Sequence, residues 1–166
     1  MKKLIAAAAL LLSSTVAFAS ELPFFAGANI GMNTKEPYVY NLGVNAGYNV
    51  MSFAGINAAV EGTYDLGYPK DEPAVGDRNI THTFAINAIP SFAIPGTSLG
   101  VYGLGGVGYR INTVGDNFGV YNIGAGVTYS ISPSIGVDAR YKRTEGIDAG
   151  KMATEDKVTV GVKYSF

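Results

Sequence analysis

The last ten residues, Lys157-Val158-Thr159-Val160-Gly161-Val162-Lys163-Tyr164-Ser165-Phe166, alternate in character from one position to the next. Valine and aromatic side chains occupy every even position, whereas lysine, threonine, glycine and serine occupy the odd positions. Successive side chains of a β-strand point to opposite faces, so this segment has one apolar face and one polar face. The pattern predicts a strand that separates an apolar environment from a polar one.

The same alternation recurs earlier in the chain, and it predicts eight strands separated by turn-rich stretches. The expected strands span residues 24–32, 38–48, 55–66, 80–89, 99–110, 119–131, 135–144 and 157–166. Pro90 cannot donate a backbone hydrogen bond to a central ladder, so we expect the fourth strand to end or bulge near it. The glycine-rich middle of segment 99–110 weakens the alternation and leaves its register poorly specified.

The amino terminus reads as a secretory leader. Two lysines precede an apolar run from Leu4 to Leu12, and Ala17-Phe18-Ala19 forms an A-x-A cleavage site. The apolar run is too short to cross a bilayer as a helix. We therefore expect residues 1–19 to be a cleaved signal peptide and residues 20–166 to form one domain.

Composition narrows the class of protein further. The chain has no cysteine, which excludes disulfides and thiolate metal sites. Its formal charge is −1, and becomes −3 when the two leader lysines are removed, so a nucleic-acid partner is not expected. The 22 glycines and 11 tyrosines favour strands and tight turns over helices.

The alternation fits two kinds of barrel. A soluble lipid-binding barrel points its apolar face inward around a ligand, whereas an outer-membrane barrel points that face at lipid. Three features favour the second: nearly charge-free apolar stripes of about 9 to 11 residues, charges of both signs on the opposite face, and short turns alternating with longer charged loops. A lipocalin would usually show a Gly-x-Trp motif, and this chain lacks tryptophan. We predict an all-β, eight-stranded antiparallel up-and-down transmembrane β-barrel.

Charged residues on the polar faces are expected to meet inside this barrel. Eight strands leave an interior just wide enough to be filled by side chains. We expect a lumen charge network in which Glu61 and Asp138 pair with Arg140, joined by Lys163 or by Arg110. These charges either satisfy one another in a narrow polar lumen or line a gated path for ions or protons.

The mature chain resembles small bacterial outer-membrane β-barrels of the OmpA, OmpX and opacity-protein type. The resemblance rests on the leader, the glycine-rich stretch 99–109, the Gly-x-Gly within 121–129, and the terminal Val-Lys-Tyr-Ser-Phe. It implies a bacterial outer-membrane location, contact with membrane lipid and lipopolysaccharide, and insertion by the barrel-assembly machinery. Tyr164 and Phe166 would form the assembly signal. Members serve as adhesins, serum-resistance factors or envelope-stabilising proteins.

We therefore expect a non-enzymatic, monomeric barrel whose role is envelope-structural or adhesin-like and is exerted through its outer loops. The expected contact surface for a host or surface ligand comprises residues 67–79 and 145–156. The alternative function is a small, low-conductance pore through the charged lumen. We expect no cofactor and no metal, although the last loop carries the acidic residues Glu145, Asp148, Glu155 and Asp156.

His82 is the single histidine, and it lies on the apolar face near a loop. Lipid A deacylase barrels of the outer membrane use a histidine and a serine near the outer rim. Here Phe84 occupies the position two residues further on, where such a serine would be required. We therefore assign His82 to an interfacial ring of side chains rather than to catalysis.

Replacing Val160 with arginine would place a charge on the apolar face at mid-strand. The substitution should cost about 2 to 4 kcal/mol of barrel stability, because arginine near the bilayer midplane loses its hydration. The folding equilibrium in lipid vesicles measures this cost. An unchanged equilibrium would refute the assignment of this face to lipid.

Overall fold

The structure, a computed structural model, describes residues 24–36, 38–53, 56–70, 79–147 and 154–166, so the expected leader lies outside it. The described residues form antiparallel strands joined into one closed barrel. The strands are β1 (Phe24–Asn33), β2 (Val39–Phe53), β3 (Ile56–Pro69), β4 (Thr81–Ala93), β5 (Leu99–Asn112), β6 (Phe118–Ser130), β7 (Ile135–Gly146) and β8 (Glu155–Ser165). Within these ranges we find no helix that is long and apolar enough to span a membrane.

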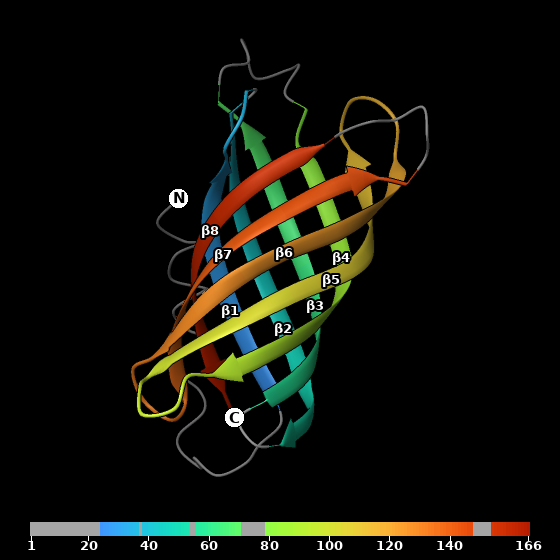
Figure 1. Cartoon of the computed structure of the whole chain (residues 1–166). Coiled ribbons are helices and arrows are strands. Elements are labelled where there is room, and N and C mark those ends of the chain that lie inside the picture. The colour runs from blue at the N-terminus through green and yellow to red at the C-terminus, as the bar shows by residue number, and fades with distance from the viewer. Residues whose placement is uncertain (1–23, 37, 54–55, 71–78, 148–153) are drawn as a thin grey trace.

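Each strand pairs with its neighbours in the sequence, and β8 closes the barrel against β1 (Figure 1). The backbone N–H of Phe166 donates to the carbonyl of Phe24 at 2.9 Å and extends this closure to the last residue. The β4–β5 and β6–β7 connections lie at the bottom of Figure 1, together with the end of β2 and the C-terminus. We call this the turn end. The opposite end is the loop end.

The strands are staggered around the barrel. A path of paired residues that starts at Phe24 returns to β1 at Thr34, whose N–H donates to the carbonyl of Asp156. The pairs on this path are Phe24–Tyr48, Tyr48–Val60, Val60–Ala88, Ala88–Gly105, Gly105–Ile123, Ile123–Arg143 and Arg143–Asp156. A stagger of this kind requires strands that tilt against the barrel axis, and eight tilted strands enclose a narrow interior.

The outward face is apolar between two levels of aromatic residues. On β2 the exposed side chains run from Tyr40 to Tyr48, and on β6 from Tyr121 to Tyr129, with only aliphatic residues between them on that face. Val160, at mid-strand in β8, is 51% exposed. The outward face therefore has the banded composition of a surface that meets hydrocarbon between two interfaces.

The inward face is more mixed than the sequence pattern predicts. Most buried residues are polar or charged, as expected for the lumen. However, several inward positions of β4, β5 and β6, and one of β1, carry large apolar side chains: Phe25, Ile89, Tyr102, Leu104, Phe118 and Val120. The lumen thus combines apolar side chains, mostly from β4 to β6, with charged side chains, mostly from β3, β7 and β8.

Inward glycines provide the space for these large side chains. A methyl group built on Gly47 would lie 2.3 Å from the ring of Phe25, and one built on Gly126 would lie 2.3 Å from the ring of Tyr102. Both distances are far below van der Waals contact. The glycines on the polar face are therefore sterically required where an aromatic ring crosses the lumen.

Several predicted boundaries are wrong. β4 continues through Pro90 to Ala93, and its pairing with β5 passes from Ala88–Gly105 to Ser91–Tyr102 without a change of register. Pro90 has no backbone N–H to donate to the ladder, but the register of the strand is the same on both sides of it. A register shift occurs instead in β2, between Asn49 and Met51. The strands also extend further than expected, because β2 reaches Phe53, β3 reaches Pro69, β7 reaches Gly146 and β8 begins at Glu155.

A pair of glycine substitutions on β5 and β6 tests the packing of the lumen. Gly126→Ala should lower the free energy of unfolding by about 1 to 3 kcal/mol, because the new methyl group displaces the Tyr102 ring. Gly105→Ala is the matched control, since no atom lies within 4 Å of its added methyl group. Urea titration in lipid vesicles measures both. Equal effects of the two substitutions would contradict the steric explanation.

Candidate functional site

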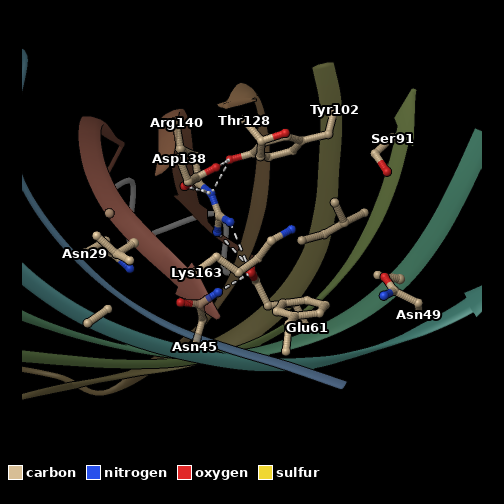
Figure 2. Close-up of a pocket in the computed structure, with 16 residues that line it drawn as sticks. Asn29, Asn45, Asn49, Glu61, Ser91, Tyr102, Thr128, Asp138, Arg140 and Lys163 are labelled. Carbon is tan, nitrogen blue, oxygen red and sulfur yellow. Dashed lines mark hydrogen bonds and ion pairs between the residues drawn. The ribbon is translucent and has the colours of Figure 1, made fainter. Parts of the chain in front are cut away.

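A hydrogen-bonded ion cluster spans the lumen in the half nearer the turn end (Figure 2). Arg140 of β7 donates from Nη1 and Nη2 to the two carboxylate oxygens of Glu61 of β3, at 2.8 and 3.1 Å. Its Nε donates to the hydroxyl of Tyr102 at 2.9 Å, and that hydroxyl donates to Asp138. Asn45 adds a bond of 2.7 Å to Glu61. We call these five residues the turn-end layer.

A second cluster fills the lumen toward the loop end. Asp65 of β3 accepts from Lys142 of β7 at 2.5 Å and from Lys157 of β8 at 3.5 Å. Lys157 also lies 3.7 Å from Glu155, which in turn pairs with Arg110 of β5. All five side chains are buried. We call them the loop-end layer.

The predicted network is therefore divided between two layers. Glu61, Asp138 and Arg140 come together as expected. Arg110 points inward, as we placed it, but it pairs with Glu155 rather than with these residues. Lys163 makes no ion pair within 4.0 Å with any described residue, and its ammonium group lies 5.0 Å from the centre of the Phe25 ring.

Four members of the loop-end layer stand on inward strand faces in the sequence, but nothing there indicates which partners they meet. Lys142 and Lys157 are paired across β7 and β8, and both reach the same oxygen of Asp65 on β3. Glu155 was placed in a loop by its polar surroundings. It faces the lumen because β8 begins two residues earlier than the alternation indicates.

A cavity of about 70 Å³ lies beside the turn-end layer, on the side of the hairpin turns. Its lining includes Lys163, Asp138 and three uncharged polar residues close to strand ends, Asn49, Ser91 and Thr128 (Figure 2). The space is large enough for a few water molecules and is lined by groups that can bind them. The described lumen therefore has room for water near the turn end and is filled with side chains toward the loop end.

The acidic residues near the last loop do not gather into a metal site. Glu155 faces the lumen, whereas Glu145 and Asp156 lie on outward-facing positions and bind tyrosine hydroxyls. Asp148 lies outside the described residues. Among the residues that the structure describes, no three histidine, cysteine, aspartate or glutamate side chains are grouped closely enough to hold a metal ion.

The terminal aromatic residues lie on the outward face at the turn end. The ring of Phe166 stacks near those of Phe24 and Tyr164, with centroid distances of 6.3 and 6.2 Å. These contacts join both ends of the described chain at the closing β1–β8 pair. The arrangement leaves Phe166 exposed, which an assembly signal requires, but its role in assembly remains a prediction.

His82 also faces outward, near the loop end. Its Nδ1 lies 2.8 Å from the hydroxyl of Tyr64, and the two rings are stacked with centroids 6.1 Å apart. Phe84 also packs against Tyr64, with ring centroids 4.9 Å apart. The three residues form part of an aromatic girdle, and the hydroxyl that the histidine contacts is that of Tyr64.

Comparison with known proteins supports the same class. The sequence matches the family described as outer membrane protein beta-barrel domain over residues 4–166. No curated protein matches it.

Three solved structures illustrate the range of proteins with this fold. The N-terminal β-barrel domain of OprF from Pseudomonas aeruginosa is 20% identical, with a TM-score of 0.57, and the match covers 86% of this chain and 97% of that one. Ail, the attachment invasion locus protein of Yersinia pestis, in complex with the heparin analogue sucrose octasulfate, is 18% identical, with a TM-score of 0.54 and coverages of 86% and 96%. The outer membrane enzyme PagL is 17% identical, with a TM-score of 0.55 and coverages of 86% and 99%.

Asp65→Asn keeps the shape of the side chain but removes the charge that two buried ammonium groups share. The variant should lose about 3 to 5 kcal/mol of stability, the usual cost of leaving a buried charge uncompensated. Urea-dependent unfolding in lipid vesicles measures the loss. The double variant Asp65→Asn, Lys142→Met also removes one positive charge and should regain part of the stability. A double variant no more stable than the single one would show that charge imbalance is not the cause.

Proposed function

The chain belongs to the outer membrane protein β-barrel domain family, and from this premise we propose that it acts as a non-enzymatic barrel with an envelope-structural or adhesin-like role at its loop end. Its location is the bacterial outer membrane. The role within that membrane is our inference. It rests above all on the way in which the lumen is filled.

Two layers of buried ion pairs cross the lumen. The turn-end layer joins Glu61 to Arg140, and the loop-end layer joins Asp65 to Lys142, so each layer links β3 to β7. Glu61 is 1% exposed and Lys157 is 1% exposed, which leaves little room for hydrated ions beside them. The two layers close the lumen at two successive levels. This arrangement favours a role for the outer surface of the barrel over transport through the lumen.

The relatives are consistent with this proposal without deciding it. The fold is shared by a protein named for attachment and invasion, and that protein is seen with a heparin analogue. It is also shared by an enzyme, so the fold alone does not exclude catalysis. Here the partner of His82 is the hydroxyl of Tyr64, an arrangement that suits an interfacial girdle. We therefore favour a surface interaction over catalysis.

The proposed contact surface is the pair of connections predicted as residues 67–79 and 145–156. Their described parts are shorter than predicted, because β3 includes Pro69 and β7 includes Gly146. Within this surface, the ammonium group of Lys70 lies 5.5 Å from the centre of the Tyr38 ring, so this cation is engaged with the barrel itself.

We further propose the processing and assembly steps that the sequence implies. Residues 1–19 direct export and are removed, and residues 20–166 insert as a monomer through the barrel-assembly machinery. The exposed Phe166, with Tyr164 beside it, provides the carboxy-terminal signal. Membrane lipid and lipopolysaccharide surround the finished barrel.

A low-conductance pore is the second candidate, and the cavity with room for water favours it. Lys163 and Asp138 line this cavity and leave part of the lumen open to water near the turn end. Conduction would require both layers to open together. The filled loop-end layer makes this the less favoured function.

Single-channel recording distinguishes the two candidates. Protein purified from outer membranes and placed in a planar bilayer should be silent, because both layers block the lumen. The quadruple variant Glu61→Ala, Arg140→Ala, Asp65→Ala, Lys142→Ala should show openings if it folds, since both links between β3 and β7 are removed. A variant that lacks only Glu61 and Arg140 should remain silent.

The double variant Arg143→Ala, Glu145→Ala is the matched control, because it removes one outward-facing ion pair and should not conduct. Folding of each variant is checked by the heat-dependent shift in gel mobility. Steady conductance of the unaltered protein that changes with Glu61→Ala or Arg140→Ala would make the pore the correct function and overturn the proposal.

A further inference from the structure

Among the strand residues that the structure describes, charged side chains occupy outward positions near the loop end on β7 and β8. On β7 and β8 the outward positions are apolar or aromatic as far as Tyr141 and Val158, and the next ones toward the loop end are Arg143, Glu145 and Asp156. On β1 to β5 the outward strand residues nearest the loop end carry no ammonium, guanidinium or carboxylate group: Met32, Tyr40, Tyr68, His82 and Ile111. The charges therefore begin where the hydrocarbon-facing band ends.

Two tyrosines hold the carboxylates of this group in place. The hydroxyl of Tyr121 donates to Glu145, and that of Tyr141 donates to Asp156 at 2.8 Å. Both tyrosines lie on the exposed apolar stripe, so their hydroxyls point out of the hydrocarbon band toward the loop end. Tyrosine takes this position at a membrane interface, with its ring in the apolar layer and its hydroxyl in the polar one.

The carboxylates in turn hold one edge of Arg143. Its Nε donates to Glu145 at 2.5 Å and lies 3.9 Å from Asp156. The terminal nitrogens Nη1 and Nη2 have no hydrogen-bond acceptor among the described residues. The side chain is 44% exposed. Arg143 therefore presents a guanidinium whose Nε is held by Glu145 and whose terminal nitrogens meet no acceptor in the part of the chain that the structure describes.

Lys35 brings a second cation to the same place. Its ammonium group lies 2.8 Å from Asp156, and its side chain is 75% exposed. Carboxylates alone at this level would repel the phosphates of a membrane surface. The two cations, Arg143 and Lys35, offset that repulsion and extend further into the polar layer.

We propose that Arg143 and Lys35 form a binding site for the phosphate of a lipid headgroup in the outer leaflet. A guanidinium with both terminal nitrogens free can bind two oxygens of one phosphate, and this bidentate geometry is among the strongest of charged hydrogen bonds. The site faces away from the lumen and lies directly above the apolar band. This position favours a phosphate fixed to a lipid over a free phosphate ion.

Titration with lipid A tests the site. Native mass spectrometry of protein purified from outer membranes, in detergent micelles, would measure the binding of lipid A that carries both phosphates. Arg143→Gln should weaken binding about tenfold, the loss expected for one charge-assisted contact of this kind. Arg143→Lys, which keeps the charge but not the fork, should give an intermediate affinity.

Lys70→Gln is the matched control. It removes the same charge near the loop end, but next to the end of β3, which lies opposite β7 in the closed strand order. The affinity of this variant for lipid A should equal that of the unaltered protein. Lipid A stripped of its phosphates should bind the unaltered protein no more tightly than the intact lipid binds Arg143→Gln, because it loses the contact with Lys35 as well.

Several results would overturn the proposal. Equal binding of the two forms of lipid A would show that phosphate is not recognised. An equal loss of affinity in Lys70→Gln and Arg143→Gln would show that the effect depends only on net charge. An unchanged affinity in Arg143→Gln would show that this residue is not part of the site. Displacement of lipid A by millimolar inorganic phosphate would assign the site to free phosphate.

Discussion

The ion pairs that link β3 to β7 are the interactions on which the interior depends. In the closed strand order these two strands lie opposite each other, so Glu61–Arg140 and Asp65–Lys142 cross the full width of the lumen. The number of strands and their stagger set the diameter of the barrel. The side chains that meet across it fill this narrow space, and because they are buried, each charge requires the partner that the opposite strand supplies.

The size of the inward residues follows from the same narrow diameter. Charged side chains of β3, β7 and β8 meet apolar ones that include Tyr102 and Leu104 of β5. Tyr102 contacts both kinds of neighbour, because its ring packs against Gly126 while its hydroxyl bonds to Arg140 and Asp138. Gly47 and Gly126 are thus explained by the aromatic rings that lie across them.

The sequence was sufficient for the fold because alternation is a local property. Each strand shows its apolar face within ten or so residues, as Tyr38 to Tyr48 does. The partners inside the lumen depend instead on stagger around the whole barrel, which no single strand contains. Glu61 and Arg140 were paired correctly by charge alone, whereas Arg110 was assigned to the wrong partners. The strand ends were also missed, since Pro90 and Glu155 both lie within ladders that the local composition argued against.

β7 connects the two regions in which charge is concentrated. Its inward residues Arg140 and Lys142 hold the lumen closed, and its next outward residue, Arg143, belongs to the charged group above the apolar band. Fixing β7 from inside also fixes the height of Arg143 relative to the membrane surface. A phosphate-binding side chain needs such a fixed height, because a strand free to slide would draw the charge into hydrocarbon. The closed lumen and the outward-facing charged group therefore both depend on the fixed position of β7.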